Sequence, residues 1–188
     1  MKTIVINLWG GPSSGKTTMA LRLAGELSII MGKDCSVEYV AEYAKSMIWR
    51  GEEELMIHQP LVTEGQIGLL SPVGKCDIVV TDSPLEVGLV YAKTIDYLQT
   101  KRLITEWKTE HDTKDIHIFI NRGDCNNFQE HGRIHTLEES LAKDQEILSF
   151  LKDRKLTFTR IEQDLDVLSV CREVLAALKK EKVCQEEV

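Results

Sequence analysis

The chain has 188 residues, of which 43% are hydrophobic, and a formal net charge of −7. This length suits one domain rather than two, so we expect a single domain over residues 1–181 and a flexible polar tail at 182–188. The negative charge argues against coating nucleic acid through an overall field, and no apolar run predicts a membrane span or secretory leader, so we expect a cytoplasmic protein with no membrane partner.

Apolar, strand-like runs recur along the chain and alternate with segments of helix length. They cover residues 3–8, 36–41, 76–81, 116–121 and 156–161. This alternation predicts an α/β fold with a parallel sheet. Ligands of such sheets collect at the carboxyl ends of the strands. The residues that close each run are therefore the candidates for a functional site.

A glycine-rich turn follows the first run. It consists of Gly10, Gly11, Pro12, Ser13, Ser14, Gly15, Lys16, Thr17 and Thr18. Glycines let the backbone wrap a phosphate while N–H groups and a helix N-terminus point at the anion. Lys16 supplies a mobile cation for the outer phosphates, and the hydroxyl of Thr17 is a ligand for magnesium. The turn predicts a site for ATP and Mg²⁺.

Three helices can be outlined from their apolar spacing and their caps. The first carries an apolar stripe, Thr136 opens another with a capping box to Glu139, and Asp164 can cap the last. The stripe of the first is Met19, Leu23, Leu27 and Ile30, and the buried face expected for the last is Leu165, Leu168, Leu175 and Leu178. Residues 122–135 have no periodicity, and we expect them to form a lid.

Glu42 should lie just past the second strand, across from the glycine-rich turn. A carboxylate there could take the proton of an attacking hydroxyl and orient its oxygen toward the γ-phosphorus. The alternative is an acid favoured at a helix start by the helix dipole. The sequence leaves both interpretations open.

Asp82 ends the buried third run and precedes Ser83 and Pro84. A carboxylate at that position can hold magnesium beside Thr17, directly or through water. It could also cap a helix that begins near the proline. The two roles are compatible, and we expect the magnesium role.

Two arginines are candidates for stabilising charge on a transferring phosphoryl group. Arg122 follows the fourth strand, and Arg133 lies within the expected lid after Gly132. Paired N–H donors of an arginine suit phosphate oxygens. The alternative is that both are ordinary surface residues.

Several strings together resemble a bacteriophage group of P-loop kinases related to thymidylate kinase, the 5-hydroxymethyluracil DNA kinases. The strings are Glu42 to Lys45 with Trp49, Thr81 to Leu85 with Gly88 to Ala92, and Asn121-Arg122 with Gly132-Arg133. The resemblance implies ATP-dependent phosphorylation of 5-hydroxymethyluracil in phage DNA, inside the host cytoplasm. It implies catalytic roles for Lys16, Glu42, Asp82 and Arg133.

From the phosphate loop and this resemblance we expect a P-loop NTPase fold of the nucleoside-monophosphate-kinase type. This is a three-layer sandwich around a five-stranded parallel sheet of order 2-3-1-4-5. The acceptor stays open between DNA containing 5-hydroxymethyluracil and a free nucleoside, nucleotide or small metabolite, and a homodimer is compatible with either. A nucleotide-hydrolysing switch is disfavoured, because Ser83 and Pro84 follow Asp82 where a motor ATPase usually carries a hydrolytic acid.

Overall fold

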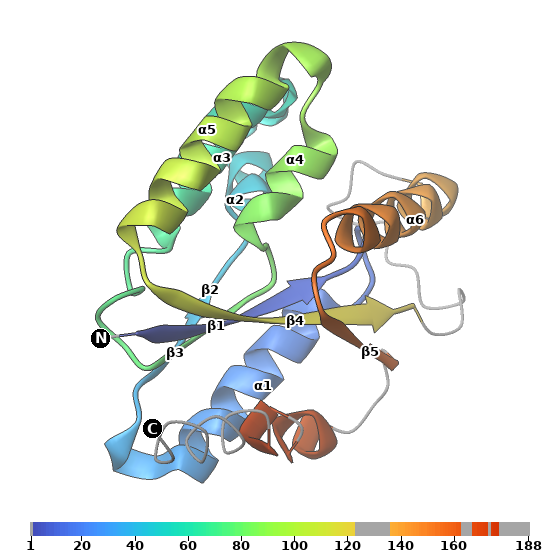
Figure 1. The fold of residues 1–188 in the computed structure, drawn as a ribbon. Helices are drawn as coiled ribbons and strands as arrows, with labels where there is room; N and C mark the ends of the chain where they lie inside the picture. The colour runs from blue at the N-terminus through green and yellow to red at the C-terminus, as the bar shows by residue number, and fades with distance from the viewer. Residues whose placement is uncertain (1, 123–135, 163–166, 173, 177–188) are drawn as a thin grey trace.

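A computed structural model describes residues 2–122, 136–162, 167–172 and 174–176. At its centre lies a five-stranded sheet of order β2-β3-β1-β4-β5 with parallel neighbours throughout (Figure 1). The strands are β1 (Thr3–Trp9), β2 (Val37–Val40), β3 (Ile78–Thr81), β4 (Thr113–Asn121) and β5 (Phe158–Glu162). The predicted strand order is confirmed.

The central strands are apolar because both of their faces are covered. Every residue of β3 is buried, as is all of β1 except Ile4, which suits an interior parallel strand. The strand β4 begins three residues earlier than the apolar run predicts. Thr113 pairs with Thr3, so the ladder with β1 continues through polar residues that are only half buried.

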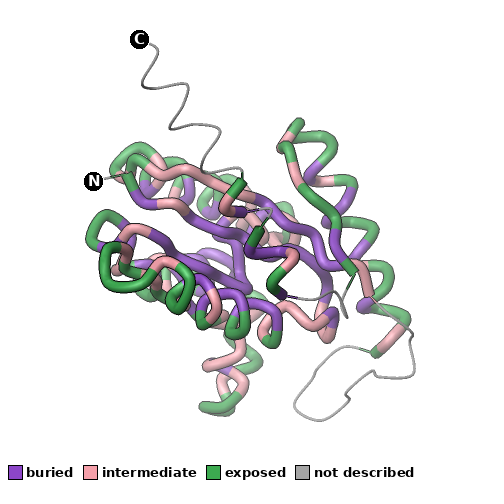
Figure 2. The backbone as a smooth tube through the Cα atoms, turned by 90° about the horizontal axis from the view of Figure 1, so that it is seen from below, coloured by how far each residue is buried: buried purple, intermediate pink, exposed green. Residues whose placement is uncertain are grey.

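Helices cover both faces of the sheet and complete the three layers (Figure 1). On one face lie α1 (Lys16–Met31) and the helical residues 167–172 and 174–176. On the other lie α3 (Gln59–Leu69), α4 (Gly88–Tyr91), α5 (Thr94–Glu110) and α6 (Leu137–Asp153), with the short α2 (Tyr43–Trp49). Short 3₁₀ helices lie between these elements: η1 (Gly32–Asp34), η2 (Glu53–Ile57) and η3 (Leu85–Val87). Figure 2 shows the buried backbone concentrated in the sheet and the inner faces of the helices.

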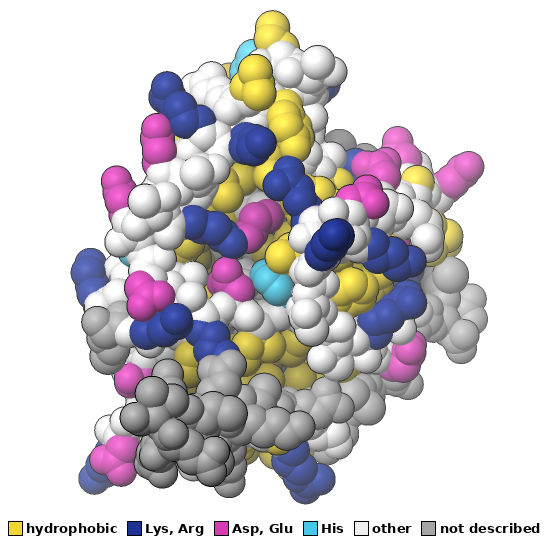
Figure 3. All heavy atoms as spheres, in the orientation of Figure 1, with side chains coloured by type: hydrophobic (Ala, Val, Ile, Leu, Met, Phe, Trp, Pro, Cys, Tyr) yellow, Lys and Arg dark blue, Asp and Glu magenta, His cyan; other side chains and the backbone are white. Residues whose placement is uncertain are grey.

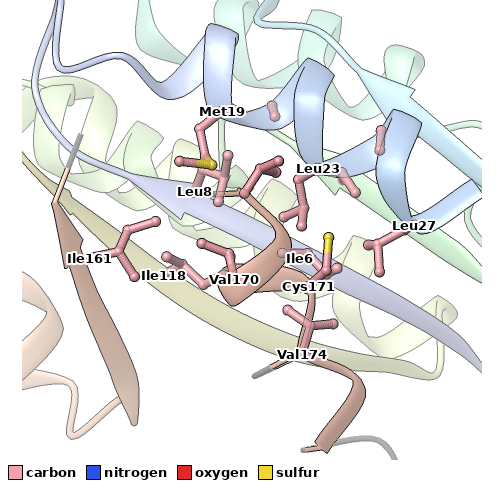
Figure 4. Close-up of a cluster of buried hydrophobic side chains, with 14 of the residues drawn as sticks. Ile6, Leu8, Met19, Leu23, Leu27, Ile118, Ile161, Val170, Cys171 and Val174 are labelled. Carbon is pink, nitrogen blue, oxygen red and sulfur yellow. The ribbon is translucent and has the colours of Figure 1, made fainter. Parts of the chain in front are cut away.

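One residue of the apolar stripe predicted for α1 is not part of the core between α1 and the sheet. Ile30 is 47% exposed because it lies in the last turn of α1, beyond the edge of the cluster that holds Leu23 and Leu27 (Figure 4). Burying apolar area is what stabilises this layer, and α1 does so through its first three turns.

The C-terminal helical residues bury valines instead of the predicted leucines. Their inner face is Val167, Val170, Cys171 and Val174, spaced three and four apart, and three of these are labelled in Figure 4. Leu168 is 39% exposed, and Leu175 is only packed against the cluster. Both leucines lie one residue away from this buried face. Asp164, Leu165 and Leu178 lie outside the described residues, as do the expected tail and residues 123–135 of the expected lid.

Candidate functional site

The glycine-rich turn joins the end of β1 to the start of α1. Gly10 and Gly15 have φ of +146° and +87°, which L side chains rarely adopt. Trp9, the last residue of β1, is buried, and its indole Nε1 donates to Nδ1 of the buried His117 on β4 at 3.0 Å. The strand end that leads into the turn is therefore tied to β4 by a side-chain hydrogen bond, and Lys16 is the first residue of α1.

The turn carries one ammonium group and several hydroxyl groups. The Nζ atom of Lys16 donates to the carbonyl oxygen of Gly11 at 2.7 Å. The hydroxyl oxygens of Ser13 and Ser14 are buried and make no hydrogen bond within the described part of the chain. Buried hydroxyls of this kind call for a partner, and phosphate oxygens can supply it. Thr18 is exposed on the first turn of α1.

Asp82 lies at the carboxyl end of β3, beside the first turn of α1. Oγ1 of Thr17 donates to its Oδ2 at 2.6 Å, and the hydroxyl of Tyr39 donates to the same oxygen at 3.2 Å. Burial, and then the charge of Asp82 with this hydrogen bond, raise the pKa of Tyr39 above its usual range. The phenol therefore stays protonated and remains a donor.

The second carboxylate oxygen of Asp82, Oδ1, is buried and makes no hydrogen bond to any described residue. Asp82 itself is 1% exposed. A hydroxyl and a carboxylate with an oxygen to spare suit Mg²⁺, which prefers hard oxygen ligands and completes its shell with phosphate and water. Within the described ranges no cluster of three or more His, Cys, Asp or Glu residues forms a metal cage. The donor set thus fits a magnesium ion that arrives with a nucleotide.

The helix-cap interpretation of Asp82 is wrong in this structure. The next helical turn, η3, has Pro84 at its cap position and no side-chain cap. The turn after β3 is instead held by Thr81, whose Oγ1 accepts the backbone N–H of Ser83 at 3.1 Å. Asp82 is thereby left to face the phosphate loop.

A cavity of about 420 Å³ opens beside the phosphate loop. Its lining combines Lys16 and Asp82 with Glu42, which precedes the first residue of α2. Further out, Lys45 and Lys93 add positive charge to the lining. Much of the remaining wall is apolar and includes Ile48, Met56, Ile57, Val62 and Val87. This size and composition are typical of a small-molecule or nucleobase pocket.

The position of Glu42 is compatible with both interpretations offered for it, and its role as a base stays a prediction. Glu42 occupies the N-cap position of α2 without a side-chain cap bond, and it lines the cavity with Lys16. Tyr91 lies on the same lining, and its pKa is raised above the usual range by burial first and by Glu42 next. Nζ of Lys143 lies 4.6 Å from the Tyr91 ring centroid.

The two arginine candidates differ in what can be described. The side chain of Arg122 is 8% exposed. Its Nε donates to Oδ2 of Asp144 at 2.9 Å, and its Nη2 donates to the carbonyl oxygen of Pro12 at 2.7 Å. It lies against the outside of the phosphate loop. Arg133 lies outside the described residues.

Three contributors to the site were missed at the sequence level. Tyr39 sits on β2 in an ordinary strand pattern, and Tyr91 belongs to a string that is quoted above only for its resemblance. Asp144 lies in the middle of α6 among polar residues. The strand-end position gives a signal for Tyr39, whereas nothing in the sequence marks Asp144.

The described lining of the cavity contains acidic residues, Glu42, Glu53 and Asp82, as well as Lys16, Lys45 and Lys93. Lysine and arginine side chains are spread among acidic ones over the face in Figure 3.

None of the helices within the described ranges has both the length and the apolar composition needed to cross a bilayer.

A family model described as an AAA domain matches residues 5–166 of the chain. No curated protein matches the sequence. Solved structures are similar at low identity. The NadR protein in complex with NAD and AMP-PNP is 20% identical with a TM-score of 0.62 over 87% of this chain, which spans only 45% of that protein.

Two other similar structures are matched almost end to end. Thymidylate kinase from Ehrlichia chaffeensis is 17% identical with a TM-score of 0.62, and the match covers 95% of this chain and all of that one. Deoxyadenosine kinase from M. mycoides with bound dATP is 15% identical with a TM-score of 0.60, and the match covers 93% and 99%. These likenesses confirm the predicted α/β fold of the P-loop nucleoside-monophosphate-kinase type.

Proposed function

The chain belongs to the AAA domain family, and from this premise we propose that it is an ATP-dependent kinase that phosphorylates an alcohol. One observation carries the proposal. Lys16 of the phosphate loop, the strand-end carboxylate Asp82 and the carboxylate Glu42 line the same cavity. A donor phosphate and an acceptor hydroxyl can therefore meet between them.

The phosphate loop binds the polyphosphate of ATP in this proposal. Its backbone N–H groups and the N-terminus of α1 hold the phosphates, and Nζ of Lys16 moves from the Gly11 carbonyl to the outer phosphates. Thr17 and Asp82 hold Mg²⁺. A magnesium ion held there would supply positive charge that offsets the negative charge developing on the phosphates.

Glu42 acts as the general base. The acceptor oxygen forms a bond to the γ-phosphorus as the bond to the β,γ-bridging oxygen breaks, and ADP leaves with that electron pair. The hydroxyl proton goes to the carboxylate of Glu42. We expect direct in-line transfer, because the cavity offers positioning and charge stabilisation without a nucleophile that stands out. Arg133 is proposed, from the sequence alone, to stabilise the transferring group.

We propose 5-hydroxymethyluracil in DNA as the acceptor, on the basis of the family resemblance. Its hydroxymethyl group projects into the major groove, so the enzyme must reach into the groove or extrude the nucleotide. The apolar cavity of about 420 Å³ has room for an extruded base. Lys45 and Lys93 on its lining are suited to the flanking backbone phosphates.

A free nucleoside or nucleotide is the second candidate acceptor. The same cavity would enclose it, and on the face drawn in Figure 3 lysine and arginine side chains are interspersed with acidic ones. Hydrolysis without an acceptor is the least favoured reaction, since Ser83 and Pro84 follow Asp82.

Labelled ATP offered to three acceptors tests these assignments. The acceptors are DNA containing 5-hydroxymethyluracil, the free 5-hydroxymethyl nucleoside, and ordinary thymine DNA, each also incubated with a Lys16→Ala variant. Label in the modified DNA alone supports the proposal. Label in the free nucleoside alone rejects the DNA acceptor but keeps the kinase, and release of labelled phosphate with no labelled acceptor rejects the kinase.

A further inference from the structure

A buried ion pair holds the outside of the phosphate loop to α6. One carboxylate oxygen of Asp144, Oδ1, accepts the backbone N–H of Gly11 at 2.5 Å. The other, Oδ2, accepts from Nε of Arg122 at 2.9 Å, and Nη2 of that arginine donates to the Pro12 carbonyl oxygen at 2.7 Å. Two successive residues of the loop are thus held by two side chains from outside it.

Both charged side chains are removed from water. The side chains of Arg122 and Asp144 are 8% and 9% exposed. Separating a buried, hydrogen-bonded pair of this kind leaves an uncompensated charge, so the contact resists opening. Its geometry is also specific, because arginine offers several donors in a fixed fork that lysine lacks.

The backbone of α6 also presses on the loop at Gly11. A Cβ atom built there would lie 2.6 Å from the carbonyl oxygen of Ser140 and 2.8 Å from Oδ1 of Asp144. The glycine is required by this close approach of two chain segments. The backbone of the loop therefore approaches α6 so closely at Gly11 that no side chain can be accommodated at this position.

The held peptide groups are connected to the lysine of the loop. The N–H of Gly11 is held by Asp144, while the carbonyl oxygen of the same residue accepts from Nζ of Lys16 at 2.7 Å. A shift of Gly11 would move the point at which Lys16 rests and reshape the turn around the phosphates. Small errors in such positioning are costly for phosphoryl transfer.

We propose that Asp144 and Arg122 form a latch that fixes the Gly11–Pro12 segment in its phosphate-binding shape before nucleotide arrives. Both are positioning residues, which gives Arg122 a role in shaping the loop in place of direct contact with the transferring phosphoryl group. The inference rests on the proposed function only for its effect on nucleotide binding. The ordering of the loop itself is independent of that function.

The first test measures hydrogen exchange at the Gly11 amide in nucleotide-free protein. Replacing Asp144 by alanine removes the acceptor, and we expect exchange at Gly11 to accelerate about 10-fold or more. Two further variants are measured. Asp153→Asn is the control, because it changes an exposed position of the same helix, and Asp144→Asn keeps the shape of the side chain but removes its charge. The first should match wild type, and the second should exchange faster, since its amide group sets a donor against Nε of Arg122. Unchanged exchange at Gly11 in both Asp144 variants overturns the latch.

The second test measures binding of a non-hydrolysable ATP analogue and of adenosine. We expect Asp144→Asn and Arg122→Lys to weaken the affinity for the analogue by roughly 10-fold or more. Adenosine carries no phosphate, so its affinity should equal that of wild type. The melting temperature of each variant without nucleotide distinguishes a specific loss of analogue binding from a general loss of structure. Analogue affinities within about twofold of wild type in both variants overturn the latch. A wild-type protein that binds no analogue overturns the proposed function instead, and the exchange result still decides whether the latch orders the loop.

Discussion

The hydroxyl of Thr17 lies 2.6 Å from Oδ2 of Asp82, joining the first turn of α1 to the carboxyl end of β3. The two residues are 65 positions apart in sequence and come from neighbouring elements of the fold. This contact brings together a hydroxyl and a carboxylate that suit the coordination shell of Mg²⁺. It also leaves Oδ1 of Asp82 available to a second interaction.

Replacing Asp82 by asparagine should weaken magnesium-dependent turnover by about 10- to 100-fold, because the pair loses its negative charge. A magnesium titration of the transfer rate measures the effect, with the midpoint moving to higher concentration. Thr17→Ser keeps the hydroxyl and serves as the matched control, which should stay near wild type. An unchanged midpoint in Asp82→Asn would remove this carboxylate from the metal site.

Glu42→Gln should lower turnover by about 10² to 10⁴ because the amide cannot accept the hydroxyl proton. Affinity for ATP should remain near normal, since the phosphates are assigned to the glycine-rich turn and Glu42 lies outside that turn, at the N-cap position of α2. Steady-state kinetics with a separate nucleotide-binding measurement distinguish the two effects. Glu38→Gln, exposed on β2, is the control, and equal turnover in both variants would contradict the assignment of Glu42 as base.

Lys16→Ala should cost rate and nucleotide affinity far more than stability. The lysine is half buried and donates to a carbonyl within its own turn, so its removal should change the melting temperature by no more than about 2 °C. Thermal unfolding and ATP binding on the same sample provide the comparison. Lys33→Ala, exposed just after α1, should leave both quantities unchanged. Loss of the folded state in Lys16→Ala would show that the residue is structural.

Strand ends could be predicted from the sequence because they combine two strong local signals. Asp82 follows the four buried residues of β3, three of which are apolar, and Lys16 follows a strand and a glycine-rich turn. Parallel topology then brings such ends to one edge of the sheet, whatever their separation in the chain. This is why Glu42 also proved to line the same cavity.

Contacts from the helix faces could not be predicted in the same way. Asp144 reaches Gly11 across 133 positions, and its place within an amphipathic helix looks like that of any solvated acid. The predicted buried face of the C-terminal helix was wrong for a related reason. Val170 and Leu168 both fit helical periodicity, and only packing against α1 buries the valine. Which of two adjacent stripes is buried depends on the tertiary arrangement.

His117 should make the stability of the fold depend on pH. Burial is the main cause that lowers its pKa, with Lys108 acting in the same direction and the carboxylates of Glu86 and Asp115 opposing it. The folded state therefore favours the neutral ring, whose Nδ1 accepts the indole N–H of Trp9 at 3.0 Å.

This contribution to stability is complete above the unfolded pKa of His117, about 6.5. It is lost as pH falls from there toward the lower folded pKa, because the unfolded chain then binds the additional proton. The free energy of unfolding should accordingly decrease between pH 7.5 and 5.5, by up to about 1.4 kcal/mol for each unit between the two pKa values. The midpoint of urea unfolding should move to lower urea concentration with it.

His117→Gln should flatten this pH dependence, because an amide oxygen can accept from Trp9 without titrating in this range. His58→Gln removes an exposed histidine and should retain the wild-type slope. Urea titrations of the three proteins at both pH values measure the difference. A slope in His117→Gln equal to that of wild type would assign the pH dependence to other groups. A loss of nucleotide binding in that variant at pH 7.5 would show that the hydrogen bond between His117 and Trp9 also affects the phosphate loop.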